Sequence, residues 1–220
     1  NSTVSANVDV GFSIVSYTGN VTEGATVGHG LSKAPELMFV KRRNVAGGWM
    51  TYSAATGATK TFTLNSTEPA YTSSGIWNNT APTADVFSLG SNGAVNANGG
   101  TYLAYCFHSV DGYSKVGSYE GNNNADGTFV YTGFQPKFII IKDIDAYQSW
   151  NLYDSVRDTN ENPVNLSLLA DNTNAEASGN PIDFLSNGFK LRDGSGMIND
   201  AETYIYIAFA ETPFKYSNAK

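Results

Sequence analysis

Few residues of this chain could transfer protons or act as nucleophiles. The 220 residues include two histidines, His29 and His108, and one cysteine, Cys106. Cys106 and His108 are two residues apart, so a β-strand would place both side chains on one face, where a Cys–His dyad is conceivable. Side chains on one strand face stand parallel and rarely meet well enough for proton transfer. We therefore interpret Cys106 as a packed structural residue and predict no catalytic residue.

Metal-binding and carboxylate patterns are equally weak. One cysteine and two histidines do not make up any common zinc site. Residues 122–127 and 193–200 are rich in the Asn and Asp oxygens that calcium prefers, yet neither has the spacing of an EF-hand loop. We interpret both as solvated turns and predict no metal and no cofactor. Paired carboxylates could also serve a glycoside hydrolase, but nothing singles out the nearest pairs, and we predict no enzymatic activity. These pairs are Asp143 with Asp145, and Asp154 with Asp158.

An aromatic residue beside amides forms the remaining candidate site. Trp77 follows a Ser-Ser-Gly turn and precedes Asn78 and Asn79. An exposed ring can stack on the face of a sugar, and amides can bond its hydroxyls. Trp77, Asn78 and Asn79 are therefore the residues expected to bind a glycan, if the chain binds one. The alternative is a hydrophobic cluster under the loop, with the Trp77 ring buried in it.

The composition excludes several partners. Charged residues make up 15% of the chain, the net charge is −7 and the pI is about 4.7. A nucleic-acid-binding protein needs a basic surface, and the basic residues here are scattered apart from Lys41–Arg43. We therefore expect no nucleic acid partner. No apolar run is long enough to span a bilayer, so we expect no membrane insertion. The single cysteine excludes an intrachain disulfide.

The chain contains an internal duplication. Five blocks of the first half return in the same order in the second half, at an offset of 101 or 102 residues. The period is that of a small domain rather than of a solenoid repeat. The corresponding blocks are Gly11–Asn20 and Gly112–Asn122, with one inserted glycine; Pro35–Lys41 and Pro136–Lys142; Trp49 with Tyr52 and Trp150 with Tyr153; Phe87–Leu89 and Phe189–Leu191; and Thr101–Phe107 and Thr203–Phe209.

The duplication predicts two similar domains joined without a flexible linker. We assign residues 1–10 to an N-terminal extension, 11–111 to the first domain and 112–220 to the second. Short apolar runs bounded by Gly, Asn and Asp turns are typical of strands, and no segment keeps the period of a helix for long. In Thr101–Phe107 and its repeat, both faces are apolar or aromatic, which indicates a central strand covered on both sides. The predicted fold is all-β, with two tandem β-sandwich halves of jelly-roll or lectin type.

A resemblance to a known family is carried by Gly11–Asn20, Thr101–Phe107, Gly112–Tyr119, Asp183–Arg192 and Ala208–Tyr216. These segments resemble a domain of unknown function that recurs in virion proteins of marine and cyanobacterial phages. In those proteins it often lies toward the C-terminus of tail fibres or other appendages. The resemblance implies a location on the virion surface, contact with other virion proteins and assembly as a homo-oligomer. It supplies no catalytic or binding residues.

Together these observations lead us to expect a non-catalytic structural or host-recognition module of a phage tail fibre or other appendage. Its ligand, if it has one, would be a host surface glycan. The sequence leaves three alternatives open. They are a carbohydrate-binding module that acts apart from a virion, a capsid decoration protein without a ligand, and a polysaccharide depolymerase.

Overall fold

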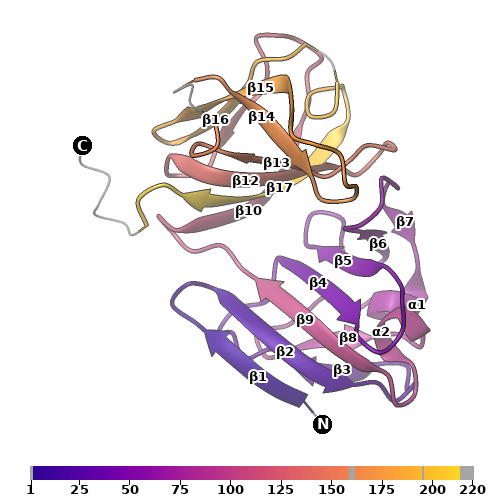
Figure 1. The fold of residues 1–220 in the computed structure, drawn as a ribbon. Coiled ribbons are helices and arrows are strands. Elements are labelled where there is room, and N and C mark those ends of the chain that lie inside the picture. Colours follow the sequence, from indigo (N-terminus) through magenta and orange to yellow (C-terminus); the bar gives the residue numbers. More distant parts are fainter. Residues whose placement is uncertain (1, 159–161, 195, 214–220) are drawn as a thin grey trace. The chain divides into compact units, whose positions relative to one another are not determined.

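The computed structural model describes residues 2–158, 162–194 and 196–213 of the chain. The chain divides into two compact units. Unit 1 comprises Asn1–Ser66 and Ala70–His108, and unit 2 comprises Thr67–Pro69 and Ser109–Lys220. Strands dominate both units, as Figure 1 shows, and the prediction of an all-β protein is confirmed. Among the described residues, no helix has the length and apolar character needed to cross a membrane.

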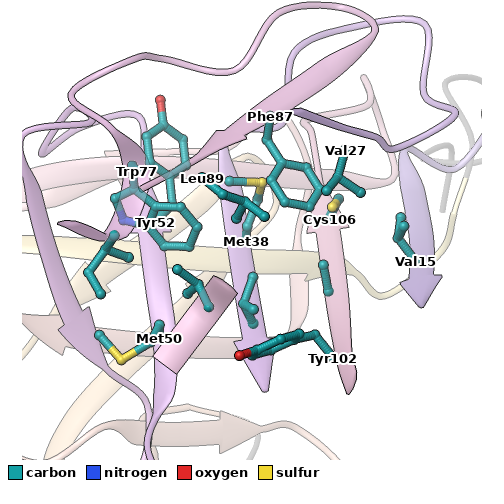
Figure 2. Close-up of a cluster of buried hydrophobic side chains, with 14 of the residues drawn as sticks. Val15, Val27, Met38, Met50, Tyr52, Trp77, Phe87, Leu89, Tyr102 and Cys106 are labelled. Carbon is teal, nitrogen blue, oxygen red and sulfur yellow. The ribbon is translucent and has the colours of Figure 1, made fainter. Parts of the chain in front are cut away.

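Unit 1 contains a large and a small antiparallel sheet. The large sheet has the strand order β1-β2-β9-β4-β5-β6-β7, and the small one pairs β3 with β8. Side chains from both sheets meet in one hydrophobic core, which Figure 2 shows in close-up. The elements are β1 (Ser2–Asn7), β2 (Phe12–Thr18), β3 (Ala25–Gly28), β4 (Leu37–Arg42), β5 (Trp49–Ser53), β6 (Lys60–Thr63), β7 (Tyr71–Thr72), α1 (Ser74–Trp77), β8 (Val86–Leu89), α2 (Gly93–Asn96) and β9 (Thr101–Phe107).

Unit 2 is built from one antiparallel sheet that nearly closes into a barrel. Its strand order is β10-β17-β12-β13-β14-β15-β16-β11, so β10 and β11 are its two edges. The sequence analysis expected two facing sheets here, but the same alternation of inward and outward side chains suits a sandwich and a barrel. The strands are β10 (Ser114–Glu120), β11 (Phe129–Tyr131), β12 (Pro136–Asp143), β13 (Asn151–Asp154), β14 (Val164–Leu169), β15 (Ala177–Leu185), β16 (Gly188–Leu191) and β17 (Thr203–Ala210).

The two units repeat the same core arrangement. Tyr17 of β2 stacks on Tyr102 of β9 with ring centroids 5.0 Å apart, and Tyr119 of β10 stacks on Tyr204 of β17, also at 5.0 Å. The hydroxyls of Tyr17 and Tyr119 each donate to a backbone carbonyl 2.8 Å away. Buried tyrosines need such an acceptor, so the paired rings fix both the packing and the polar contacts at this end of each core.

At one pair of facing positions, the larger residue lies on β2 in unit 1 and on β17 in unit 2. Val15 faces Ala104 across β2 and β9, whereas Gly117 faces Tyr206 across β10 and β17. A Cβ atom on Gly117 would lie 2.8 Å from the Tyr206 hydroxyl, so the tyrosine ring occupies the space that a side chain on β10 would need. The pairing register therefore makes Gly117 the counterpart of Val15. Gly117 is therefore not the inserted residue that the comparison of Gly11–Asn20 with Gly112–Asn122 predicted.

The N-terminal residues belong to the sheet of unit 1 and are not a separate extension. Ser2–Asn7 form β1, which pairs antiparallel with β2. All six residues are exposed, although Val4 and Ala6 alternate with polar residues along the strand. In unit 2 the matching hairpin is reduced to a single bridge between Val110 and Ser114. The segment before that bridge, Thr101–Phe107, already forms β9 of unit 1, and no strand in the described part of unit 2 covers β10 as β1 covers β2.

A fully buried lysine, Lys142, lies in β12. Its ammonium donates to the backbone carbonyl of Asp143 at 2.5 Å. Burial lowers its pKa from 10.5 to about 8, although the carboxylates of Asp143 and Asp171 oppose the shift. Folding therefore favours the neutral amine. The contribution of Lys142 to stability is largest above pH 10.5 and is lost as the pH falls to 8.

Lys142→Met is expected to raise the free energy of unfolding at pH 7 by roughly 2 kcal/mol, because methionine has a similar shape and no charge to desolvate. Denaturant unfolding at pH 7 and at about pH 9.5 measures the change, and the gain should shrink at the higher pH. Lys137→Met is the matched control, since Lys137 is exposed on the same strand. Equal gains from both variants, or a gain independent of pH, would contradict this account.

Candidate functional site

The residues predicted to bind a glycan lie at the end of α1 in unit 1. Trp77 is only 1% exposed and packs edge-on against Tyr52, with ring centroids 5.9 Å apart. Figure 2 shows both rings among the core side chains. Asn78 and Asn79 follow with φ values of 53° and 50°, a left-handed conformation that asparagine tolerates better than most residues. A buried ring offers no face to a sugar, so the alternative interpretation, Trp77 as an anchor under the loop, fits this place.

The two histidines and the cysteine are buried in unit 1. His29 donates from Nε2 to the Thr83 carbonyl at 3.1 Å, and its Nδ1 accepts the N–H of Leu31 at 3.2 Å. Both ring nitrogens are thus held by the backbone, and burial lowers the pKa of His29. Burial raises the pKa of the Cys106 thiol to about 12, so the reactive thiolate does not form near neutral pH. Burial therefore disfavours the thiolate that a Cys106–His108 dyad would need.

The carboxylate pairs hold loops of unit 2 in place. Asp143 accepts two backbone N–H groups of its own loop, and Asp158 accepts those of Asn165 and Leu166 at 2.6 and 3.0 Å. Asp154 forms an ion pair with Arg157. Within the described residues, no group of three or more His, Cys, Asp or Glu side chains is placed to hold a metal ion. These acidic residues therefore serve the scaffold.

The two Asn- and Asp-rich segments of unit 2 meet around a buried amide. Nδ2 of Asn199 donates to Oδ1 of Asn122 at 3.1 Å and to the carbonyls of Asn124 and Asp193 at 2.9 and 2.5 Å. The amide nitrogen thus stands where these oxygens could otherwise attract a cation. Asn96 has the same role in unit 1, where it donates to two backbone carbonyls at 3.0 and 2.9 Å. The duplication therefore includes a buried asparagine in each core.

A polar cavity opens between the two edge strands of unit 2, β10 and β11. Its volume is about 280 Å³, and we call it the seam cavity. Tyr131 projects from β11 at its rim and is 66% exposed. Asp111 is exposed in the hairpin turn, and Lys115 is half-buried on β10. The wall consists of Ser109, Asp111, Gly112, Ser114, Lys115, Tyr131, Thr132 and Gly133.

The corresponding place in unit 1 is filled by β1. The pairing of β3 with β8 matches that of β11 with β16, so Gly28–Gly30 correspond to Tyr131–Gly133. The last glycine of each triplet has a positive φ, 71° and 87°. A Cβ atom on Gly30 would lie 2.7 Å from Cγ1 of Val4, which shows how closely β1 covers this position. Among the residues that the structure describes, unit 2 has no such strand, and it has a tyrosine where unit 1 has Gly28.

Hydroxyl groups of the cavity wall are already bonded to the backbone of unit 2. The Ser109 hydroxyl accepts the N–H of Val116 at 3.0 Å, and the Thr132 hydroxyl donates to the Phe134 carbonyl at 2.6 Å. These bonds stiffen the wall. The groups that a ligand would meet are the Tyr131 ring, the Asp111 carboxylate and the Lys115 ammonium, together with the outer lone pairs of the hydroxyls.

The seam cavity was not predicted from the sequence. Two outward aromatic residues on one short strand, Phe129 and Tyr131, were one signal for it. A second was the comparison of Val27–Gly30 with Val130–Gly133, in which a tyrosine replaces a glycine. Neither signal shows that the hairpin turn carrying Asp111 lies opposite β11, because that juxtaposition needs the sheet to curl until its edges approach.

Comparison with known proteins places the chain in a family. A family model for a domain of unknown function, DUF7483, matches residues 1–213. The chain belongs to this family. The match spans both units, so the region that defines DUF7483 includes the duplicated pair and the seam cavity. No curated protein and no solved structure matches the chain.

Proposed function

We propose that this DUF7483 chain is a non-catalytic structural and host-recognition module of a phage virion, carried on a tail fibre or another appendage. The five segments that resemble phage virion proteins support this setting. A module of this kind acts on the outside of the particle without turnover. It needs a rigid frame, and it needs a surface that can meet a ligand.

The observation that carries the proposal is the contrast between the two cores and the seam cavity. Buried polar groups such as His29, Asn96 and Asn199 bind the backbone and hold the frame. The seam cavity, by contrast, is lined by Tyr131, which is largely exposed, and by the charged residues Asp111 and Lys115. An aromatic ring beside a few polar groups on a rigid wall is a common arrangement for ligand recognition.

Two further roles follow from the same setting. Other virion proteins are the proposed partners, and a homo-oligomer is the proposed assembly, because the resembled proteins are parts of fibres and appendages. The seam cavity also favours a second candidate function, a carbohydrate-binding module that acts apart from a virion. That candidate needs the same cavity but no virion attachment.

Immunogold electron microscopy of intact phage particles, with antibody raised against the full chain, tests the proposal. Gold on the tail, fibres or other appendages is the expected result. Gold spread over the capsid would favour a decoration protein instead. Absence of gold from particles that are shown to be intact would refute the virion setting and leave the free carbohydrate-binding module.

A further inference from the structure

We infer that the seam cavity of unit 2 binds a neutral saccharide, with the Tyr131 ring as its stacking surface and Asp111 and Lys115 as its hydroxyl-binding groups. This inference rests on the proposed function, because it names the class of ligand that the host-recognition module would take.

The position of Tyr131 is the first reason. Val130 beside it is buried in the core of unit 2, so the backbone of β11 holds the tyrosine outward on a fixed strand. The Tyr131 hydroxyl lies 3.6 Å from the point where a Cβ atom on Gly133 would stand. The ring therefore extends along the rim toward Gly133, and a larger residue there would meet it. A rigid, exposed ring loses little conformational entropy when a sugar face covers it.

The charges of the wall are the second reason. The Asp111 carboxylate can only accept hydrogen bonds, and the Lys115 ammonium can only donate them. Sugar hydroxyls do both, so one saccharide can satisfy both groups at once. An anionic ligand would be repelled by Asp111, and a cationic one by Lys115. A neutral, hydroxyl-rich ligand fits this pair of opposite charges best.

A peptide strand is the other occupant to consider, since β1 fills this place in unit 1. The edge of β10 is already engaged, however. The N–H groups of Ser114 and Val116 are each bonded at 3.0 Å to residues of the incoming hairpin. At the other end of the strand, the Glu120 carbonyl accepts the Thr128 hydroxyl at 2.7 Å. An added strand would have to displace these bonds, which blunt the edge, whereas a small ligand would not.

Unit 1 supplies an internal comparison. Its corresponding triplet begins with Gly28 and ends under β1, so it has neither the ring nor the opening. Both units share the stacked tyrosines and the buried asparagine of the frame. The seam cavity is thus a difference between two otherwise similar cores.

The test uses the full chain and an array of neutral oligosaccharides built from hexoses and N-acetylhexosamines, followed by calorimetric titration with the glycan that binds best. We expect Tyr131→Ala to weaken binding at least about tenfold, and Tyr131→Phe to stay within about threefold because the ring remains. Tyr147→Ala is the matched control, since Tyr147 is 73% exposed in unit 2 and does not line the cavity. Its affinity should equal that of the unaltered chain.

Three results would overturn the inference: no binding to any glycan of the array, binding that Tyr131→Ala leaves unchanged, or capture of a synthetic peptide with the β1 sequence in place of glycans. The two proposals fail separately. Gold on an appendage, together with no glycan binding, would contradict the saccharide site and still support the virion module. Glycan binding that depends on Tyr131, in a chain absent from virions, would support the saccharide site and contradict the location on a virion.

Discussion

Tyr206→Ala is expected to lower the free energy of unfolding of unit 2 by about 3–4 kcal/mol. The Tyr206 ring is buried, meets Phe189 edge-on with ring centroids 5.3 Å apart, and covers Gly117 on the facing strand. Its removal leaves a void that β10 cannot fill, because the residue opposite has no side chain. Unit 1 fills the same space from the other strand, with Val15 facing Ala104.

A substitution on the facing strand, at Gly117, tests whether positions 117 and 206 are energetically coupled. Gly117→Val alone should cost about 2 kcal/mol, because its Cβ would lie 2.8 Å from the Tyr206 hydroxyl. The double variant Gly117→Val with Tyr206→Ala recreates the valine–alanine pair of unit 1. We expect its loss to be smaller than the sum of the single losses by about 2 kcal/mol.

Denaturant unfolding gives the free energies for this cycle, and amide hydrogen exchange read by mass spectrometry separates peptides of unit 2 from those of unit 1. Ser118→Val is the matched control, since Ser118 is exposed on β10 next to Gly117. Its effect should stay within about 0.5 kcal/mol. Additive losses in the double variant would show that the two positions do not share one space.

Asn199→Ala is the second change with a large expected effect, a loss of about 3 kcal/mol from unit 2. Asn199 is fully buried and accepts the N–H of Asn122 at 3.1 Å through its side-chain oxygen. Its Nδ2 bonds the three oxygens described above. Alanine would remove these four hydrogen bonds and leave a void where the buried amide of Asn199 stood.

The duplicated core provides a replicate of this experiment. Asn96→Ala should destabilise unit 1 in the same way, because Asn96 accepts the N–H of Asn20 at 2.9 Å and donates to two carbonyls. Hydrogen exchange should show faster opening in the altered unit. Asn174→Ala, at an exposed asparagine of unit 2, is the control and should change little. A loss of stability confined to the unit without the substitution, or no loss from either Asn96→Ala or Asn199→Ala, would contradict the structural role of these two asparagines.

The sequence predicted the duplication and the strands that its blocks share, among them β2, β9, β10 and β17, whereas β15 was not predicted. Alternation along a strand is a local property with a period of two, so it shows which side chains face inward regardless of how the sheet closes. The stacked tyrosines, Tyr17 with Tyr102 and Tyr119 with Tyr204, lie on the buried faces of their strands. The composition likewise indicated an all-β chain, since aromatic and β-branched residues fit pleated surfaces.

The sequence could not indicate whether Trp77 is buried or which distant residues the asparagines contact. Trp77 beside two asparagines has the same pattern whether its ring is exposed or buried, and its burial depends on Tyr52 from a distant strand. The asparagines within residues 122–127 predicted a solvated turn. Their link to Asn199, 77 residues away, follows only from the folded loops.

Sequence by itself thus determined that the chain is all-β and that two copies of one pattern follow each other. Tertiary structure alone decided which strand covers which edge. All six residues of β1 are exposed, yet they close the edge of β2. The segment that would close the edge of β10 is already used as β9, because one stretch of backbone can occupy only one place in a sheet. The seam cavity, with Tyr131 at its rim, is the consequence of that competition.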